Sequence, residues 1–166
     1  MTIRKLNRLK DFDYLASGAY FITIYTKNRI NFFGNIENCK VNLYNYGNLA
    51  KKYWKEIPKH YNDTIIDEFI IMPNHIHGII MIFRKEQCSV PAKNNSIGLI
   101  SKIIKSYKEI VTKSICNDYN VNNFCWQRSF HDHIIRNEEG LDKIREYIYY
   151  NPLKWEYDKD NINSIM

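Results

Sequence analysis

The stretch FIIMPNHIHGIIMIF, residues 69–83, decides the fold of this chain. Two apolar runs flank Pro73-Asn74, a pair that favours a tight turn, so we expect a β-hairpin with strands over 64–72 and 75–83. Because alternate side chains of a strand share one face, His75 and His77 would point the same way from a buried strand. Two buried imidazoles need polar partners. A shared divalent metal would satisfy both, and a pair of hydrogen-bonded core histidines is the alternative.

The segments on either side of this hairpin complete a recognisable order of elements. Residue propensity predicts a strand over 20–26, and apolar residues at helical spacing predict helices over 45–58 and 97–116. A loop with room for a short hairpin covers 31–42. A further strand is expected over 129–136, followed by a helix that Asn137 caps and Asn151-Pro152 ends. This order predicts an α+β fold, a ferredoxin-like β-α-β-β-α-β antiparallel sheet with an extra C-terminal helix.

Length and composition bound the organisation of the chain. Its 166 residues, 45% of them hydrophobic, predict a single globular domain over 1–166, with a basic arm at 1–18 and a short tail at 156–166. Because the sequence has neither a signal peptide nor about 18 consecutive apolar residues, we expect a cytoplasmic protein with no membrane span. The widely spaced cysteines favour neither a zinc finger nor a disulfide framework; they are Cys39, Cys88, Cys116 and Cys125.

The net charge of +6 favours a polyanionic partner, most simply nucleic acid. Lys102 and Lys105 lie off the apolar stripe of the helix predicted over 97–116, and Arg128 and Arg136 flank the last strand, which contains His133. As a set, these five side chains are candidates for contacts to a DNA backbone. For each lysine or arginine alone, an ordinary solvated surface position is the alternative, and for His133 it is a structural role.

The last predicted helix contributes two further polar residues. Tyr147 and Asn151 are four residues apart, so they stack on one side of that helix. Taken alone, they fit a boundary tyrosine and a helix-terminal asparagine. Taken with the two histidines, they predict a nuclease site. Three neutral ligands would leave a Mg²⁺ or Mn²⁺ ion with open positions for phosphate oxygens, and the tyrosine hydroxyl would attack phosphorus.

Three blocks of the sequence resemble one known family. The block MPNHIHGII (72–80) resembles the histidine-hydrophobic-histidine (HUH) motif of single-tyrosine transposases, most closely of the REP-associated tyrosine transposases. The blocks WQRSFHDHIIR (126–136) and EYIYYNPLK (146–154) resemble the second half of that family. The resemblance runs from about residue 20 to 155. It implies that His75, His77 and Asn151 bind a divalent metal, and that Tyr147, on a helix packed near the metal strand, is the nucleophile.

The expected function is metal-dependent cleavage and transfer of single-stranded DNA through a 5′-phosphotyrosine link, at hairpin-flanked sites, by a monomer or a homodimer. One alternative is a related nickase, a replication initiator or relaxase, although those usually come in longer chains. Another is a non-catalytic nucleic-acid-binding or regulatory protein on the same fold. A plain metal-binding protein is the last alternative.

Overall fold

In the computed structural model, described over residues 18–83, 98–119 and 123–155, the chain forms one main sheet and three long helices. The elements are, in order, β1 (Gly18–Tyr25), η1 (Lys27–Arg29), β2 (Gly34–Glu37), β3 (Lys40–Leu43), α1 (Asn45–His60), β4 (Thr64–Ile71), β5 (His75–Ile82), α2 (Leu99–Tyr119), β6 (His131–Ile135) and α3 (Glu138–Lys154).

The main sheet has the strand order β4-β5-β1-β6, and each neighbouring pair is antiparallel. Helix α1 connects β1 to β4, and α2 connects β5 to β6, so two β-α-β units interleave. This is the ferredoxin-like arrangement that the sequence predicts, with α3 as the extra C-terminal helix. The segment expected to be a loop contains the short antiparallel hairpin β2–β3, which stands outside the main sheet.

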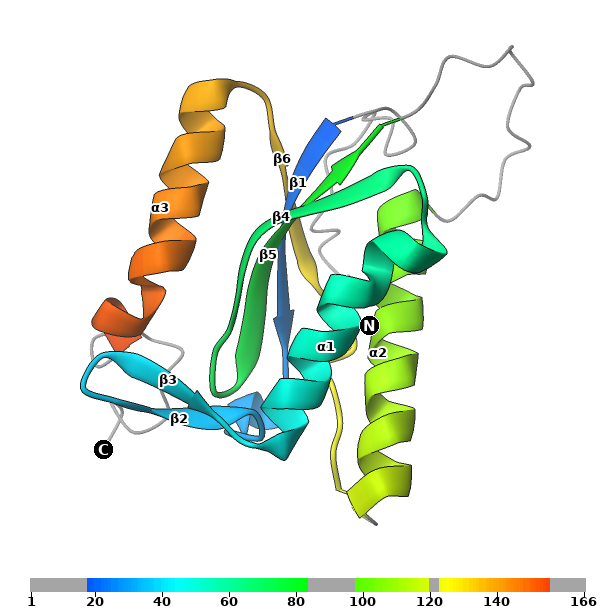
Figure 1. The fold of residues 1–166 in the computed structure, drawn as a ribbon, viewed down its shortest axis with the longest axis vertical. Helices are drawn as coiled ribbons and strands as arrows, with labels where there is room; N and C mark the ends of the chain where they lie inside the picture. The colour runs from blue at the N-terminus through cyan, green and yellow to red at the C-terminus, as the bar shows by residue number, and fades with distance from the viewer. Residues whose placement is uncertain (1–17, 84–97, 120–122, 156–166) are drawn as a thin grey trace, which may run out of the picture.

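The two faces of the sheet carry different layers. Figure 1 shows α1 and α2 together on one face and α3 alone on the other, with the β2–β3 hairpin near the C-terminal end of α3. Side chains of β1 alternate between the layers: Ile22 and Ile24 join the core beneath α1 and α2, whereas Phe21 packs with the apolar residues beneath α3. The first core is the larger, and it surrounds the fully buried Trp54 of α1.

Gly78 fixes how α1 lies against the histidine strand. A β-carbon at this position would stand 2.4 Å from Cζ2 of Trp54 and 3.0 Å from Cβ of Phe69. The absence of a side chain therefore lets the indole ring pack directly on β5, next to His77 in the sequence. The strand that carries both histidines is an interior strand of the sheet and is buried along nearly its whole length.

Two helix ends differ from the sequence prediction. Proline was expected to end α1 and α3, yet Pro58 and Pro152 lie inside these helices, which run on to His60 and Lys154. Each proline stands in the final turn, where only a short stretch of helix follows. After Pro152 that stretch is held by the buried Trp155, whose backbone N–H donates to the carbonyl of Pro152. Asn151 is therefore an interior residue of α3 and not its terminal residue.

The remaining predictions concern the cysteines, the chain ends and membrane spans. Three of the cysteines are free thiols, namely Cys39, Cys116 and Cys125. The fourth, Cys88, lies outside the described residues, as do the basic arm over 1–17, the loop over 84–97 and the tail over 156–166. None of the helices in the described ranges combines the length and hydropathy of a transmembrane span.

Candidate active site

Both histidines of β5 point toward α3. His75 is 0% and His77 is 3% exposed, and their ring centroids lie 4.5 Å apart. The alternation read from the sequence places them on this face, because Ile76 between them joins the core under α1 and α2. Two polar rings are thus buried side by side beneath a single helix. The partners of their nitrogen atoms decide whether they are simply packed or serve as ligands.

One nitrogen of His75 is satisfied and the other is not. Asn74 donates from Nδ2 to the carbonyl of Arg29 at 3.0 Å, which orients its amide so that Oδ1 faces Nδ1 of His75 at 2.8 Å. Nδ1 must therefore carry the proton, and Nε2 presents a lone pair. Nε2 is buried without a hydrogen-bond partner. Burial, and secondarily the charge of Arg29, lowers the pKa of His75 to about 3, so the ring is neutral at physiological pH.

His77 is oriented in a similar way by β1. Its Nδ1 lies 2.9 Å from Oγ1 of Thr23, the residue paired with it across the two strands. Its ring stacks on Phe21 with the centroids 5.3 Å apart. The opposite nitrogen, Nε2, lies 3.4 Å from the hydroxyl of Tyr147. Each histidine therefore uses Nδ1 for a fixed partner and directs Nε2 toward the space under α3, the arrangement common for metal-ligating histidines.

Helix α3 presents three residues to these rings at four-residue intervals. The ring of Tyr147 lies 5.3 Å from that of His77, and the ring of Trp155 lies 6.0 Å from that of His75. Asn151 stands between them on the helix, is 1% exposed, and has an Oδ1 atom without a hydrogen-bond partner. Tyr147 is 40% exposed, so its hydroxyl faces His77 while part of its ring remains accessible to a substrate.

An ion pair ties α3 to the sheet two residues before Tyr147. Arg145 donates from Nε to Oδ1 of Asp67 at 3.0 Å and from Nη2 to Oδ2 at 2.6 Å. Asp67 lies in an irregularity of the β4–β5 pairing between Ile66 and Phe69. The hydrogen bond from Arg145 lowers the pKa of Asp67 below its usual value, which keeps the carboxylate charged. Since Arg145 uses both carboxylate oxygens, the pair fixes how α3 lies against the sheet.

The residues around the histidines fit a divalent cation. Within the described ranges, no three His, Cys, Asp or Glu side chains gather, so the two histidines need a third ligand of another type. Nε2 of His75 and Oδ1 of Asn151 are buried acceptors without a donor, and such atoms suit a cation. Imidazole nitrogen together with amide oxygen is a neutral ligand set that leaves the charge of Mn²⁺ or Mg²⁺ available to an anionic substrate.

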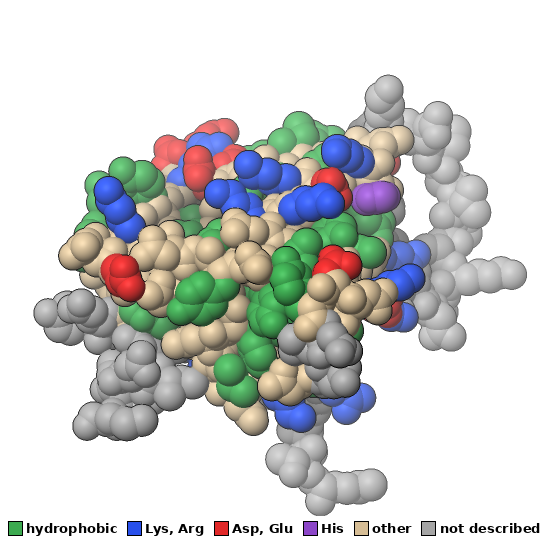
Figure 2. Space-filling view, turned by 60° about the horizontal axis from the view of Figure 1, so that its bottom comes forward, with side chains coloured by type: hydrophobic (Ala, Val, Ile, Leu, Met, Phe, Trp, Pro, Cys, Tyr) green, Lys and Arg blue, Asp and Glu red, His purple; other side chains and the backbone are tan. Residues whose placement is uncertain are grey.

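The candidate DNA contacts are spread over different parts of the surface. On the face seen in Figure 2, lysine and arginine side chains are interspersed with acidic ones, so the positive charge is not gathered into one patch there. Lys102 and Lys105 are exposed on α2, across the sheet from the histidines, and Lys105 pairs with Glu109 at 3.7 Å. These two lysines therefore lie on the opposite side of the sheet from the candidate metal ligands, and their contact with DNA stays a prediction.

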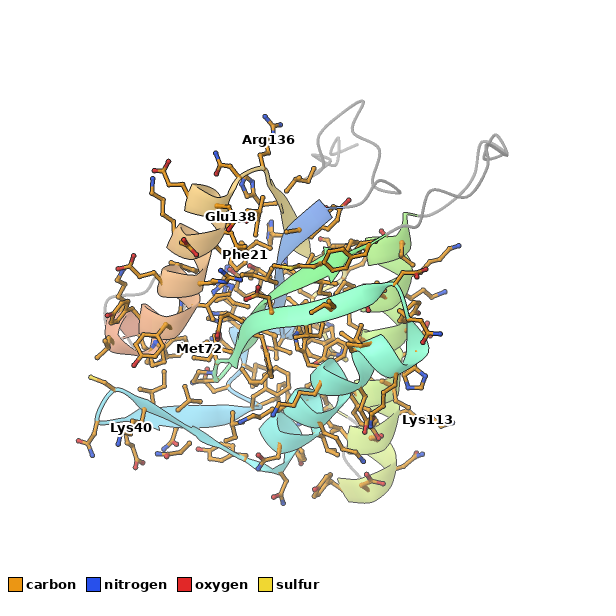
Figure 3. The ribbon with its side chains drawn as sticks, turned by 45° about the horizontal axis from the view of Figure 1, so that its top comes forward. Phe21, Lys40, Met72, Lys113, Arg136 and Glu138 are labelled. Atoms are coloured by element: carbon orange, nitrogen blue, oxygen red, sulfur yellow. The ribbon has the colours of Figure 1, made fainter. Side chains whose placement is uncertain are left out.

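The other candidates lie along β6. His133 is exposed and pairs with Phe21, so it belongs to the same sheet face as the histidines of β5. Arg136 follows the far end of β6, about 17 Å from His77 along the strand direction, and Figure 3 shows it at the opposite end of the sheet from Met72. Arg128 precedes β6 at the other end, where the neighbouring Gln127 bonds to the backbone of Tyr25.

Several residues of this site were not predicted from the sequence. Thr23 and Phe21 orient His77, Trp155 covers His75, and Tyr25 lies 5.3 Å from His75 between ring centroids. Only Trp155 had a sequence signal, because it continues the four-residue spacing of Tyr147 and Asn151. The residues of β1 depend on strand pairing over more than 50 positions, which no local pattern reveals.

Three comparisons with known proteins were informative to different degrees. No family model matches the chain. An uncharacterised protein of Haemophilus influenzae is 39% identical over 94% of this chain and 92% of its own length. A second protein of that species, named "Putative REP-associated tyrosine transposase", is 26% identical over 87% of this chain and 76% of its own length. The solved structure of a REP-associated tyrosine transposase bound to a REP hairpin has the same fold, with a TM-score of 0.56 and 19% identity over 92% of this chain and 77% of that one. The chain is therefore similar to REP-associated tyrosine transposases, in sequence to one named relative and in fold to one solved structure.

Proposed function

We propose that this protein cleaves one strand of DNA and rejoins it through a covalent 5′-phosphotyrosine link to Tyr147, with the help of a divalent metal. Its relationship to transposases supports the broader role in DNA transposition. One observation carries the specific mechanism: the Tyr147 hydroxyl lies 3.4 Å from Nε2 of His77, beside two buried acceptor atoms that lack donors. A partly exposed nucleophile next to a set of potential metal ligands is what metal-assisted phosphoryl transfer requires.

The metal would be held by Nε2 of His75, Nε2 of His77 and Oδ1 of Asn151. When bound, a divalent metal supplies Lewis-acid polarisation of the scissile phosphate and offsets charge that develops on its oxygens. The protein's part is to hold both imidazole rings in the correct orientation. Asn74 and Thr23 do this through the Nδ1 atoms.

The reaction balances without an external energy source. The Tyr147 oxygen forms a bond to phosphorus as the bond from phosphorus to the 3′ oxygen breaks. The phenol gives up its proton, and the departing 3′ oxygen takes one up to become a hydroxyl. Because a phosphodiester is exchanged for another phosphodiester, a second 3′ hydroxyl can reverse the step and join a new strand. The partial exposure of Tyr147 would let a DNA strand reach its hydroxyl.

The DNA substrate is proposed to be single-stranded, next to a hairpin. The structurally similar transposase was solved with a REP hairpin, and this chain has a net charge of +6. Imperfect palindromes that flank the gene for this protein are therefore the first oligonucleotides to test.

The test is covalent capture. The protein is incubated with a labelled oligonucleotide that contains such a palindrome and its single-stranded flank, in Mn²⁺, and is then run on a denaturing gel. We expect a labelled adduct that disappears with EDTA and in Tyr147→Phe. Tyr150→Phe is the matched control, since Tyr150 lies on the same helix and is equally exposed at 40%.

The outcomes separate the remaining alternatives. Adduct that persists in Tyr147→Phe would refute the assignment of the nucleophile. Tight binding of the hairpin with no adduct in any divalent metal would favour the non-catalytic DNA-binding protein. Thermal stabilisation by Mn²⁺ without any affinity for DNA would leave only the metal-binding role.

A further inference from the structure

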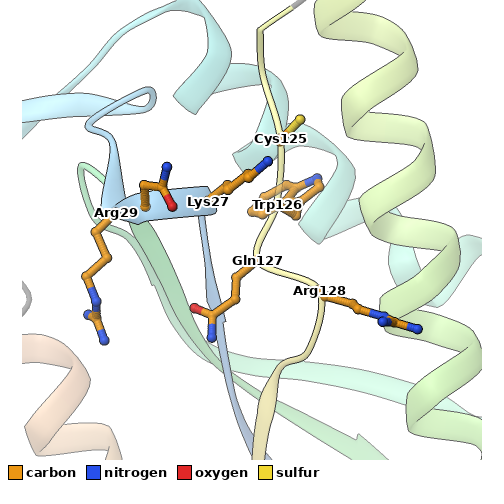
Figure 4. A pocket seen from close by; sticks show the side chains of 7 residues that line it. Lys27, Arg29, Cys125, Trp126, Gln127 and Arg128 are labelled. Atoms are coloured by element: carbon orange, nitrogen blue, oxygen red, sulfur yellow. The ribbon is translucent and has the colours of Figure 1, made fainter. Parts of the chain in front are cut away.

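A pocket of about 660 Å³ opens where two loops meet beside the histidine hairpin. One loop supplies Lys27, Asn28 and Arg29, and the other supplies residues 125–128, as Figure 4 shows. Neither the proposed metal ligands nor Tyr147 lines this pocket, so it is separate from the site described above.

Backbone hydrogen bonds hold the two walls of the pocket together. The N–H of Lys27 donates to the carbonyl of Cys125 at 2.9 Å, and the N–H of Gln127 donates to the carbonyl of Tyr25 at 2.8 Å. Nζ of Lys108, on α2, donates to the carbonyls of Gln127 and Ser129 at 2.8 and 3.1 Å. The pocket is therefore a built feature of the fold and not a chance gap between surface side chains.

The pocket is strongly basic. Lys27, Arg29 and Arg128 line it, and the described residues contribute no carboxylate to it. In Figure 4, Arg128 points toward α2 and Arg29 points toward the side of the molecule that carries α3. The cations thus lie at both ends of the pocket, an arrangement that suits an extended polyanion better than a single compact anion.

The end at Arg29 connects the pocket to the candidate active site. The guanidinium carbon of Arg29 lies 4.1 Å from the centroid of the Tyr25 ring, and that ring lies 5.3 Å from the His75 ring. The backbone of Arg29 is held by the same amide of Asn74 that orients His75. A strand bound along the pocket would therefore be directed toward the phosphate position at the metal.

We propose that this pocket binds the backbone of single-stranded DNA that continues from the scissile phosphate, with Lys27, Arg29 and Arg128 contacting successive phosphates. This inference rests on the proposed function and adds to it the path of the unpaired strand. Arginine pairs with phosphate through two parallel hydrogen bonds, and side chains such as Gln127 at the wall can contact bases that are not paired.

The test compares two double variants in the Tyr147→Phe background, where no covalent link forms. Lys27→Gln/Arg128→Gln removes two positive charges from the pocket. Lys102→Gln/Lys105→Gln removes two from exposed positions across the sheet and serves as the matched control. Binding is measured by fluorescence anisotropy over a range of salt, with one hairpin oligonucleotide that has a single-stranded extension and one that lacks it. Inorganic phosphate and a mononucleotide are added as competitors.

For the pocket variant, we expect about tenfold weaker binding of the extended hairpin and unchanged binding of the blunt one. The slope of log affinity against log salt for the extended hairpin should fall by about 1.4, because each single-strand phosphate contact contributes about 0.7. The control variant should bind both DNAs as the parent does, and millimolar phosphate or mononucleotide should not compete.

Three results would overturn the proposal. Equal losses in both double variants would mean that only the overall charge matters. Equal losses for the two DNAs would place the contact on the hairpin, and competition by phosphate alone would indicate a site for a small anion. These results leave covalent capture by Tyr147 intact, whereas failure of the proposed function would appear as absence of the adduct in the wild-type protein.

Discussion

The face of the sheet covered by α1 and α2 differs from the face covered by α3 in what it buries. The first face packs isoleucines and aromatic residues between the sheet and two helices, around Trp54. The second face has only a small apolar cluster, and next to it lie two buried histidines and a buried asparagine. The apolar core under α1 and α2 supplies most of the stability of the fold. The face under α3 can therefore tolerate the cost of burying polar atoms that lack hydrogen-bond partners.

Helix α3 buries few apolar side chains, in keeping with the small apolar cluster on its face of the sheet. Its buried residues are Leu141, Ile148 and Asn151, and its tyrosine at 147 is 40% exposed. The helix is positioned by a few specific contacts, above all the pair Arg145–Asp67. A helix held in this way can present a nucleophile to the sheet without contributing much to the core. The following predictions compare the two faces, from the largest expected effect to the smallest.

Ile79 and Ile80 are adjacent on β5, fully buried, and belong to opposite faces. We expect Ile80→Ala to lower the free energy of unfolding by about 4 kcal/mol and Ile79→Ala by about 2 kcal/mol. The cavity left by Ile80 lies between the sheet and two packed helices, whereas α3 can settle onto the space left by Ile79. Urea denaturation measures both. Equal losses would show that the two faces contribute alike to stability.

Removal of His75 should affect chemistry and leave the core intact. His75→Leu is expected to reduce covalent capture by about 100-fold and to abolish thermal stabilisation by Mn²⁺. The free energy of unfolding without metal should fall by only about 1 kcal/mol, because removal of the unsatisfied Nε2 partly offsets the loss of the donor to Oδ1 of Asn74. His60→Leu, at an exposed position of α1, is the control. A large loss of metal-free stability would instead indicate an ordinary core histidine.

The hydroxyl of Thr23 tests the orientation of His77. Thr23→Val keeps the shape of the side chain but removes the partner of Nδ1, and we expect about tenfold weaker Mn²⁺ binding by calorimetry. Thr112→Val is a matched control, since its hydroxyl donates within α2 on the opposite side of the molecule. Unchanged metal affinity in Thr23→Val would mean that stacking on Phe21 alone orients the ring.

The pair Asp67–Arg145 predicts a pH dependence. The pKa of Asp67 is lowered in the folded state, so its stabilising contribution is present above its unfolded value of about 3.8 and is lost as the pH falls through the lower folded value. We expect Asp67→Asn to cost about 1 kcal/mol or less at pH 7, because the pair is partly exposed. The stability curves of variant and wild type should converge as the pH falls below 4. Parallel curves from pH 7 to pH 2 would contradict this role.

Local patterns were enough for most of the fold. The break at Pro73-Asn74 between two apolar runs predicted the β4–β5 hairpin, and alternation placed His75 and His77 on one face. The spacing of Tyr147 and Asn151 placed both on one side of the last helix. Helix ends were less predictable, because the buried Trp155 stabilises the turn after Pro152 against the intrinsic tendency of proline to end a helix.

The sequence by itself determined which residues could form the site, because periodicity is a local property and each element folds on its own repeat. Only the tertiary structure decided which residues meet. Strand pairing brings Thr23 to His77, an ion pair from β4 sets the position of α3, and two loops about 100 residues apart form the basic pocket beside His75. Contacts of this kind depend on the packing of distant segments, and no local pattern of residues encodes them.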